Sequence, residues 1–560
     1  MDAKKSGFSA GGYFKDITPK LFTCLKGYKA EQFAKDVISG IIVAIIALPL
    51  SIALALASGV GPEQGLYTAI VAGFIIAVLG GSRVQIAGPT AAFATIVAGI
   101  VAKNGMEGLA AATIIAGIIL VIMGLCKFGS LIKYIPYTIT TGFTAGIAVT
   151  IVIGQIKDFL GLTFKSAPVE TMEKVEAIAK SISTVNWYAL LIGVISLAIL
   201  IIWPRIKYVN KIPGSLIAVI AASAIVKLSG MQVNTIGSLY TISASLPEFN
   251  MPSLSFGVIK SVLPDAFTIA VLAGIESLLS CVVADGMIGS RHRSNAELVA
   301  QGVGNVGSAL FGGIPATGAI ARTAANIKNG GRTPIAGMVH SVTLLLILVL
   351  LMPYASLIPM PTIAAILFMV AYNMCGYREF IKLVKRAPKS DVLVLVATFI
   401  LTIVFDLVVA IEVGIIMAAI LFMKRMSDTA EIKGWKYIED EEDDAESINL
   451  RKVPKNTLVY EITGPMFFAA ADKFMEISLD PSINVIILRM RSVPAMDVTA
   501  LHTLESVLET CKKHNIVLLM SHVQEQPMSM MKRAGFDKAV GVENFCENID
   551  AALARAEKIS

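Results

Sequence analysis

Apolar segments that could each cross a membrane follow one another from Asp36 to Met426, and no other feature constrains the fold as strongly. One membrane-spanning helix needs about 20 apolar residues, and counting the segments one by one predicts about 14 spans. The chain of 560 residues is only 16% charged, whereas soluble globular proteins carry roughly a quarter of their residues as Asp, Glu, Lys and Arg. This composition excludes a cytosolic enzyme, a secreted disulfide scaffold, a disordered chain and a nucleic-acid-binding protein.

The distribution of lysine and arginine fits a chain that crosses the membrane an even number of times. Seven lysines precede the first span, and the alternate connections carry cations, whereas Gly61–Gly65, Gly312–Pro315 and Pro353–Pro361 contain neither Lys nor Arg. We therefore predict that both termini are cytoplasmic. The expected spans are centred near Ile46, Phe74, Ile96, Ile115, Ala148, Ile195, Ile220, Ile275, Val303, Ala321, Leu345, Leu367, Val396 and Ile415.

An internal repeat divides these spans into two halves. Pro49 in the first span precedes Gly88-Pro89-Thr90, and Glu276 in the eighth span precedes Ile314-Pro315-Ala316-Thr317 at nearly the same distance. In each half the second proline precedes an unusually short apolar segment. The halves are offset by an odd number of spans and would insert in opposite orientations. Matching short spans interrupted by Gly and Pro indicate a transporter binding site, although both residues are frequent in membrane helices generally.

The two short spans predict an anion site built largely of backbone. A half-helix that begins at mid-membrane exposes unpaired N–H groups and the positive end of its dipole. By the expected topology, the two positive ends face one another across a central gap. Hydroxyl donors would come from Thr90 and Thr317, and small residues would leave room for a ligand. These small residues are Ala91, Ala92, Ala319 and Ala321.

Two charged residues inside the spans carry alternative interpretations. Arg322 lies about one turn into the second half-helix, where it either adds a cation to the anion site or snorkels toward the inner surface. Glu276 either accepts a coupling proton or only neutralises Arg322. Other polar residues near span ends, such as Asp36, Asp285 and Glu297, are expected to be solvated or to cap helices. Gln301 and Asn305 are expected to form hydrogen bonds between helices.

The sequence favours secondary transport over ATP-driven pumping or catalysis. It contains no G-x-x-x-x-G-K-[ST] loop, no C-x-x-C pair and no histidine in a metal-ligand spacing. We therefore expect no cofactor, no metal site and no catalytic residue. A membrane sensor that binds anions without moving them is the main alternative.

The segment beyond Met426 predicts a separate α/β sandwich of alternating strands and helices. The acidic run Glu439–Glu446 marks the linker that precedes it. The expected strands are Leu458–Ile462, Asn484–Leu488 and Asn515–Met520, and the expected helices are Ala470–Leu479, Thr499–His514, Gln526–Ala534 and Asn548–Lys558.

From about Phe33 to Ala554 the chain resembles the SulP family of anion permeases, called solute carrier family 26 in animals. The motifs that carry the resemblance, in order, are Ala47-Leu48-Pro49-Leu50-Ser51, Gly65-Leu66-Tyr67, Gly88-Pro89-Thr90-Ala91-Ala92-Phe93, Ile275-Glu276-Ser277-Leu278-Leu279, Ala319-Ile320-Ala321-Arg322-Thr323-Ala324, and Gly464-Pro465 with Asp497-Val498-Thr499. The resemblance implies an all-α polytopic domain with a seven-plus-seven inverted repeat, followed by a STAS domain. The implied boundaries are an N-terminal segment 1–32, a transport domain 33–426, an acidic linker 427–446 and a STAS-like domain 447–560.

The resemblance also implies the site and the partners. Substrate would lie between the third and tenth helices, flanked by the first and eighth, which adds Pro49, Ser51, Phe93 and Ile320 to the predicted binding residues. Leu50 stands where many members have a polar Gln, which implies a more apolar wall there. Expected partners are a small anion with a co-transported proton or sodium ion, membrane lipid, a second copy of the chain, and a protein docked on the STAS-like domain.

Within the family, Ile275–Leu279, Asp285–Met287 and Ser294–Val299 resemble bacterial C4-dicarboxylate transporters. This implies proton-coupled uptake of succinate-like acids across the bacterial plasma (inner) membrane, with sulfate or bicarbonate as alternative substrates. Asp497 and Thr499 lie where related regulatory domains can be phosphorylated. The alternative is that one of them caps the helix that follows.

Overall fold

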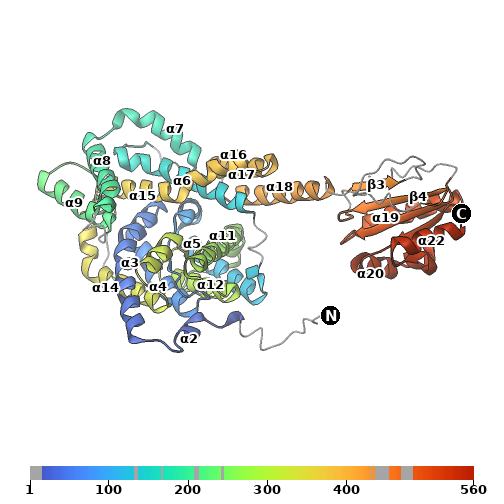
Figure 1. Cartoon of the computed structure of the whole chain (residues 1–560). Coiled ribbons are helices and arrows are strands. Elements are labelled where there is room, and N and C mark those ends of the chain that lie inside the picture. The colour runs from blue at the N-terminus through green and yellow to red at the C-terminus, as the bar shows by residue number, and fades with distance from the viewer. Residues whose placement is uncertain are drawn as a thin grey trace. The chain divides into compact units, whose positions relative to one another are not determined.

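The computed structural model forms two compact units, Met1–Ile415 and Ile416–Ser560, and the boundary falls within one helix (Figure 1). It describes residues 16–130, 136–165, 168, 170–206, 213–240, 245–405, 407–428, 431–435, 453–467 and 483–559. The first unit is helical, whereas the second is built on a mixed sheet.

In the described part of the chain, eight helical stretches are long and apolar enough to cross a membrane, by length and composition. They are α3 (Ala30–Ala57), α4 (Pro62–Leu79), η1 with α5 (Ala91–Phe93 and Ala94–Leu125), α6 (Tyr137–Leu160), α8 with η4 (Trp187–Ile202 and Trp203–Arg205), α11 (Phe256–Ile288), α14 (Ile335–Ala355), and α15 with α16 (Met360–Cys375 and Tyr377–Arg386). The further helices of the first unit include α9 (Gly214–Ser229), α12 (Ser294–Leu310), α13 (Ile320–Lys328), α17 (Lys389–Val404) and α18 (Leu407–Asp428), the last of which crosses the unit boundary.

Every expected span centre falls within one of these helices, which confirms the predicted all-α membrane fold. Helix α5 accounts for two centres, because Gly105 adopts a left-handed φ of 67° and separates its two parts. Glycine pays no steric cost in that region, so the break needs no other residue type. The remaining short elements of this unit are α2 (Lys20–Cys24), α7 (Thr171–Ser181), η3 (Ile182–Thr184) and α10 (Ile236–Leu239).

The helices of the first unit pack as two groups. Helices α3, α4, α5, α11, α12, α13 and α14 contact one another, and α6, α8, α9, α15 and α17 form the second group. Figure 1 shows α6, α15 and α17 on one side of the unit and α4, α5, α11 and α12 on the other. Glycines allow close packing inside the first group. An added Cβ on Gly117 of α5 would lie 2.6 Å from the carbonyl oxygen of Gly302 on α12.

The inverted repeat is visible in the order of elements. Helices α3 and α4 precede the two-residue strand β1 (Ala87–Gly88) and the start of η1–α5, and helices α11 and α12 precede β2 (Thr317–Gly318) and the short helix α13. The two strands pair antiparallel, as the opposite insertion of the halves requires. The structure therefore confirms the predicted inverted arrangement.

The second unit is a five-stranded sheet in the order β3-β4-β5-β6-β7. The strands are β3 (Glu431–Trp435), β4 (Thr457–Thr463), β5 (Val485–Ser492), β6 (Val517–Ser521) and β7 (Phe545–Cys546), and β3 alone is antiparallel to its neighbour. The helical elements are α19 (Val498–Lys513), α20 (Glu525–Ala534), α21 (Phe536–Val540), η7 (Val542–Asn544) and α22 (Ile549–Ile559). Alternate strand residues enter two hydrophobic cores, one on each face. This confirms the predicted α/β sandwich.

Parts of the predicted second unit differ from the structure or lie outside it. Strand β3 lies inside the expected linker 427–446 and extends the sheet, because its residues pair with β4 from Glu431↔Thr463 to Trp435↔Val459. The acidic run Glu439–Glu446 and the expected helix Ala470–Leu479 lie outside the described residues.

Two glycines of α5 provide a matched test of the helix packing. Gly117→Ala should lower the apparent melting temperature of the detergent-solubilised protein, because the new Cβ meets backbone of α12; overpacking of this kind costs about 1–3 kcal/mol. Gly99→Ala is the control, since no atom lies within 4 Å of an added Cβ there, and it should leave the melting temperature unchanged or slightly raised. Equal melting temperatures for the two variants would contradict the packing described.

Candidate anion-binding site

The pairing of β1 with β2 brings the two interrupted segments together. Ala87 lies opposite Gly318 and Gly88 lies opposite Thr317, and the Ala319 N–H donates to the carbonyl oxygen of Ile86 at 2.9 Å. Pro89 directly follows Gly88, and Pro315 lies two residues before Thr317. The structure therefore brings together two segments that are more than 200 residues apart, as the sequence predicts.

Each half-helix begins beside the ladder with free backbone donors. Thr90 precedes η1 and Ala319 precedes α13, and no side chain of the described residues caps either helix. The first N–H groups of a helix have no partner within the helix and carry the positive end of its dipole. Two electropositive helix starts therefore adjoin one two-residue ladder.

Arg322 adds its positive charge to the start of the other half-helix. The side chain is only 2% exposed, and its Nη2 donates to the carbonyl oxygen of Pro89. Its Nε and Nη1 have no hydrogen-bond partner among the residues that the structure describes. The guanidinium can lie this close to the backbone because residue 88 is a glycine: an added Cβ there would be only 2.4 Å from Nη1 of Arg322. The alternative that Arg322 snorkels to the inner surface is therefore wrong.

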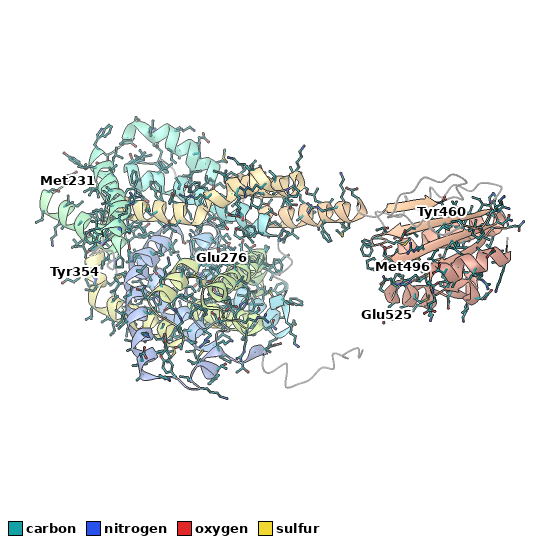
Figure 2. All side chains as sticks on the ribbon, viewed as in Figure 1. Met231, Glu276, Tyr354, Tyr460, Met496 and Glu525 are labelled. Atoms are coloured by element: carbon teal, nitrogen blue, oxygen red, sulfur yellow. The ribbon has the colours of Figure 1, made fainter. Side chains whose placement is uncertain are left out.

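Glu276 bonds to the residue that follows Pro89. Its Oε2 accepts a hydrogen bond of 3.0 Å from the Thr90 hydroxyl, and Figure 2 places the residue in the interior of the first unit. Within the described part of the chain, none of the three Arg322 nitrogens bonds to Glu276. No direct ion pair therefore joins Glu276 to Arg322 among these residues. Arg322 bonds to Pro89, and Glu276 bonds to the next residue, Thr90.

The second predicted hydroxyl donor is bonded into the scaffold. Thr317 is fully buried, and its Oγ1 lies 2.7 Å from Oγ of Ser277 and 3.3 Å from the carbonyl oxygen of Ala273. Ser277 also accepts from the N–H of Gly318 at 3.1 Å. Helix α11 therefore fixes β2 through Ser277, one residue after Glu276 in the sequence.

The other predicted binding residues divide by exposure. Ile320 and Ala321, at the start of α13, are exposed, and Thr90 and Glu276 are half-buried. The buried ones are Pro49, Ser51, Ala91, Phe93 and Ala319. The hydroxyl of Ser51 has no partner in the described ranges. The side chains of the first set are at least partly accessible, whereas those of the second set are enclosed by neighbouring residues.

A row of polar side chains on α12, which the sequence did not reveal as part of the site, holds both strands. Glu297, Gln301 and Asn305 are each fully buried and follow one another four residues apart. The Gln301 amide donates to Glu297 at 2.9 Å, and the Asn305 amide donates to the backbone carbonyl oxygen of Gln301 at 2.8 Å. The side-chain amide of Asn305 pairs with both backbone groups of Ala316, at 2.8 and 2.9 Å. Asn305 therefore fixes the chain immediately before β2.

Glu297 fixes the segment that leads into β1. Its Oε2 accepts from the N–H groups of Gly81 and Ser82, at 2.9 and 3.2 Å, and its Oε1 accepts from Gln85 at 2.7 Å. The expectation that Glu297 is solvated or caps its helix is wrong, because four N–H donors replace water around it. Glu297 lies four residues before Gln301 and eight before Asn305, so the three side chains share one helix face. This spacing could have indicated a buried polar row from the sequence.

Asp36 is a second carboxylate for which solvation, one of its two expected roles, is wrong. It is fully buried and accepts from the hydroxyls of Tyr28 and Thr333, at 2.8 and 2.6 Å, and from the backbone N–H of Arg332 at 2.8 Å. Burial and this bond raise the pKa of Tyr28 to about 12, so the phenol remains a donor at physiological pH. Asp36 therefore joins the start of α3 to the chain between α13 and α14.

In the second unit, Asp497 caps α19. Its Oδ1 accepts from the N–H of Ala500 at 2.9 Å, which confirms the capping interpretation for this residue. Thr499 is exposed in the first turn of α19. Its modification remains a prediction.

Two opposed half-helices, joined at an electropositive ladder inside a bundle of membrane-spanning helices, define a membrane carrier for negatively charged solutes. Comparison with known families gives the particular group. The model of the Sulfate permease family matches residues 33–398 and the STAS domain matches residues 447–552. The chain belongs to the sulfate permease family, whose members are transporters and not enzymes.

Similar proteins and structures agree with this assignment. The "Putative sulfate transporter YvdB" of Bacillus subtilis is 40% identical over 531 residues, which cover 94% of this chain and 98% of that protein. The "Bicarbonate transporter BicA" of Picosynechococcus is 31% identical over 85% of this chain and 86% of that protein. The structure of murine Solute Carrier 26 family member A9 superposes with a TM-score of 0.86 at 18% identity, over 100% of this chain and 96% of that one. The cyanobacterial BicA transmembrane domain gives 0.61 at 30% identity, over 70% of this chain and 98% of that domain.

Gly88→Ala tests the position of Arg322. The added Cβ would collide with the guanidinium of Arg322, so we expect that group to move. Because the φ of 158° at Gly88 also strains any side chain, the melting temperature of the variant is measured first, and affinity is compared only if the protein is folded. Anion affinity, measured by ligand-dependent thermal stabilisation, should fall about tenfold, the effect of losing roughly 1.4 kcal/mol. Gly99→Ala is the control and should bind like the wild type. Unchanged affinity in Gly88→Ala would show that Arg322 does not contribute from this position.

Proposed function

We propose that this protein is a secondary active transporter that takes up a small anion together with a proton, through the gap between the two half-helices. The observation that carries the proposal is the convergence of charge at Pro89 and Thr90. The two uncapped helix starts and the Arg322 guanidinium contribute positive charge there, and the Glu276 carboxylate contributes negative charge.

Protonation of Glu276 would change the net charge of this site. With Glu276 ionised, its charge offsets that of Arg322. With Glu276 protonated, one positive charge and the two helix dipoles remain, and the site attracts an anion more strongly. The bond from Thr90 transmits the change directly, because Thr90 is also the residue from which the first half-helix starts. Proton and anion would therefore bind together and move in the same direction.

Ligand contacts would come mainly from backbone. We propose that the N–H groups of Ala91 and Ala321 bind anion oxygens, with Ile320 and Leu50 forming the apolar wall. Buried residues of the predicted set, such as Phe93 and Ala319, would hold the N-terminal ends of the two half-helices in place by packing. Movement of the helix group that carries the ladder against the group of α6, α8, α9, α15 and α17 would then expose the site alternately to either side.

For the substrate we propose C4-dicarboxylates such as succinate, which the sequence motifs favour. A second candidate class is sulfate or bicarbonate, because relatives at 40% and 31% identity carry those names. Backbone N–H groups bind carboxylate, sulfate and bicarbonate oxygens by the same physics. The choice therefore depends on the size of the gap and on substrate charge.

We further propose a homodimer in the bacterial plasma membrane with both termini in the cytoplasm. The cations of the alternate connections support that orientation. The STAS domain would then be a cytoplasmic docking module. Phosphate on the exposed Thr499 would add negative charge near the start of α19, a position that the helix dipole favours.

Glu276→Gln separates coupling from binding. The amide can still accept from Thr90 but cannot take up a proton, so anion binding should persist while the pH dependence of uptake disappears. Uptake by the wild-type protein in proteoliposomes should rise severalfold when the outside is acidified, and uptake by Glu276→Gln should respond less than twofold. Glu107→Gln, at an exposed carboxylate of α5, is the matched control and should keep the wild-type response. Full proton coupling in Glu276→Gln would refute the role of Glu276.

A substrate panel tests transport itself. Radiolabelled succinate, sulfate and bicarbonate should each be offered to proteoliposomes under an imposed proton gradient, an imposed sodium gradient, or neither. We expect accumulation of succinate under the proton gradient alone. Accumulation of only sulfate or bicarbonate would select the second class. Binding without gradient-driven accumulation of any of the three would favour a membrane sensor.

A further inference from the structure

Helix α16, between α15 and α17, has three distinct faces. Its ten residues contain four cations and one carboxylate, and none of its residues is buried. Tyr377, Ile381 and Val384 follow one another at helical spacing and are 40%, 47% and 42% exposed. The first unit therefore presents an exposed apolar stripe on a strongly basic helix.

The cations lie together on the adjoining face of α16. Arg378, Lys382, Lys385 and Arg386 repeat at the same helical spacing, offset by one residue from the apolar stripe. Lys382 has a weak partner in Glu379, at 3.4 Å on an exposed surface. Lys385 and Arg386 are exposed and bond to no residue in the described ranges of the chain. Their charge is available to an external anion.

The third face attaches α16 to the second helix group. The Phe380 ring lies 5.2 Å from the ring of Phe399 on α17, and α16 also contacts α6. The connections at both ends are very short. Gly376 alone, with a left-handed φ of 55°, separates α16 from α15, and α17 begins at Lys389. The apolar residues of the stretch Met360–Arg386 lie mainly in α15, and the sequence predicts a further span at α17. We therefore expect α16 to stay at the level where these two helices end.

We propose that α16 lies in the plane of the membrane and binds the headgroups of anionic phospholipids through Lys385 and Arg386. An amphipathic helix with a basic face and an aromatic or aliphatic face inserts its apolar residues at the boundary between headgroups and acyl chains. Basic residues at that level attract anionic lipid by about fivefold each. The two tethers place the apolar stripe beside acyl chains, which favours lipid over a soluble protein as the occupant. Bound lipid would hold the α6–α17 group against the leaflet.

The test compares two double variants of the full-length protein in a neutral detergent. Lys385→Gln/Arg386→Gln removes the unpartnered cations, and Lys512→Gln/Lys513→Gln removes two adjacent exposed cations from α19 in the second unit. Each protein is titrated with phosphatidylglycerol or phosphatidylcholine, and retained lipid is measured by native mass spectrometry. The α16 variant should bind phosphatidylglycerol about 25-fold more weakly than the wild type, whereas the α19 variant should match the wild type.

Further arms distinguish a lipid site from a general effect. Lys385→Arg/Arg386→Lys should restore phosphatidylglycerol binding, because both charges are kept. Inorganic phosphate at the same phosphate concentration should not displace the lipid, since it lacks the acyl chains that contact Ile381 and Val384. Equal phosphatidylglycerol retention in the α16 variant and the wild type, or full displacement by inorganic phosphate, would overturn the proposal. Lipid retention is measured without transport, so this result is independent of the proposed function.

Discussion

The antiparallel pairing of Ala87 and Gly88 with Gly318 and Thr317 is the interaction on which the rest of the site depends. These two residues from each half of the chain supply hydrogen-bond partners for each other's backbone. Inside an apolar bundle, unpaired backbone groups would be costly. After each strand the backbone continues into a half-helix whose first N–H groups have no partner within the helix. A small piece of sheet thus produces two electropositive ends that a continuous helix could not present at this depth.

Buried polar groups around the ladder serve two different purposes. Glu297 accepts from backbone and amide N–H groups, and Asn305 donates to two backbone carbonyl oxygens and accepts from the N–H of Ala316, so both hold the segments around β1 and β2 without attracting a solute. Arg322 is the opposite case, because two of its nitrogens remain without partners among the described side chains and backbone. A buried cation that is incompletely bonded retains its attraction for an anion. Glu297 and Asn305 therefore serve to position the backbone, whereas Arg322 keeps a positive charge that an anion can bind.

Most of the fold could be predicted from the sequence, because span length and the cation distribution are local properties of the chain. The half-helices could also be predicted, since Gly88-Pro89 and Pro315 interrupt both halves in corresponding places. The direction of the Arg322 side chain could not be predicted, because spacing alone does not show which carbonyl oxygen a long side chain reaches. The role of Glu297 was missed for a similar reason. Its four donors come mainly from residues more than 200 positions away, and its place near a span end suggested solvent. Strand β3 was missed because its sequence, with Glu431 and Lys433, has the composition of a linker and gains its structure only from pairing with β4.

Locating a bound anion tests the central claim most directly. Selenate or bromide, soaked into crystals of the full-length protein, can be placed by anomalous scattering without assumptions about the map. We predict a peak within hydrogen-bonding distance of the first N–H groups of both half-helices, near Ala91 and Ala321, on the side of the ladder that faces Glu276. A strongest peak elsewhere in the transmembrane unit, with no density between the two helix starts, would contradict it.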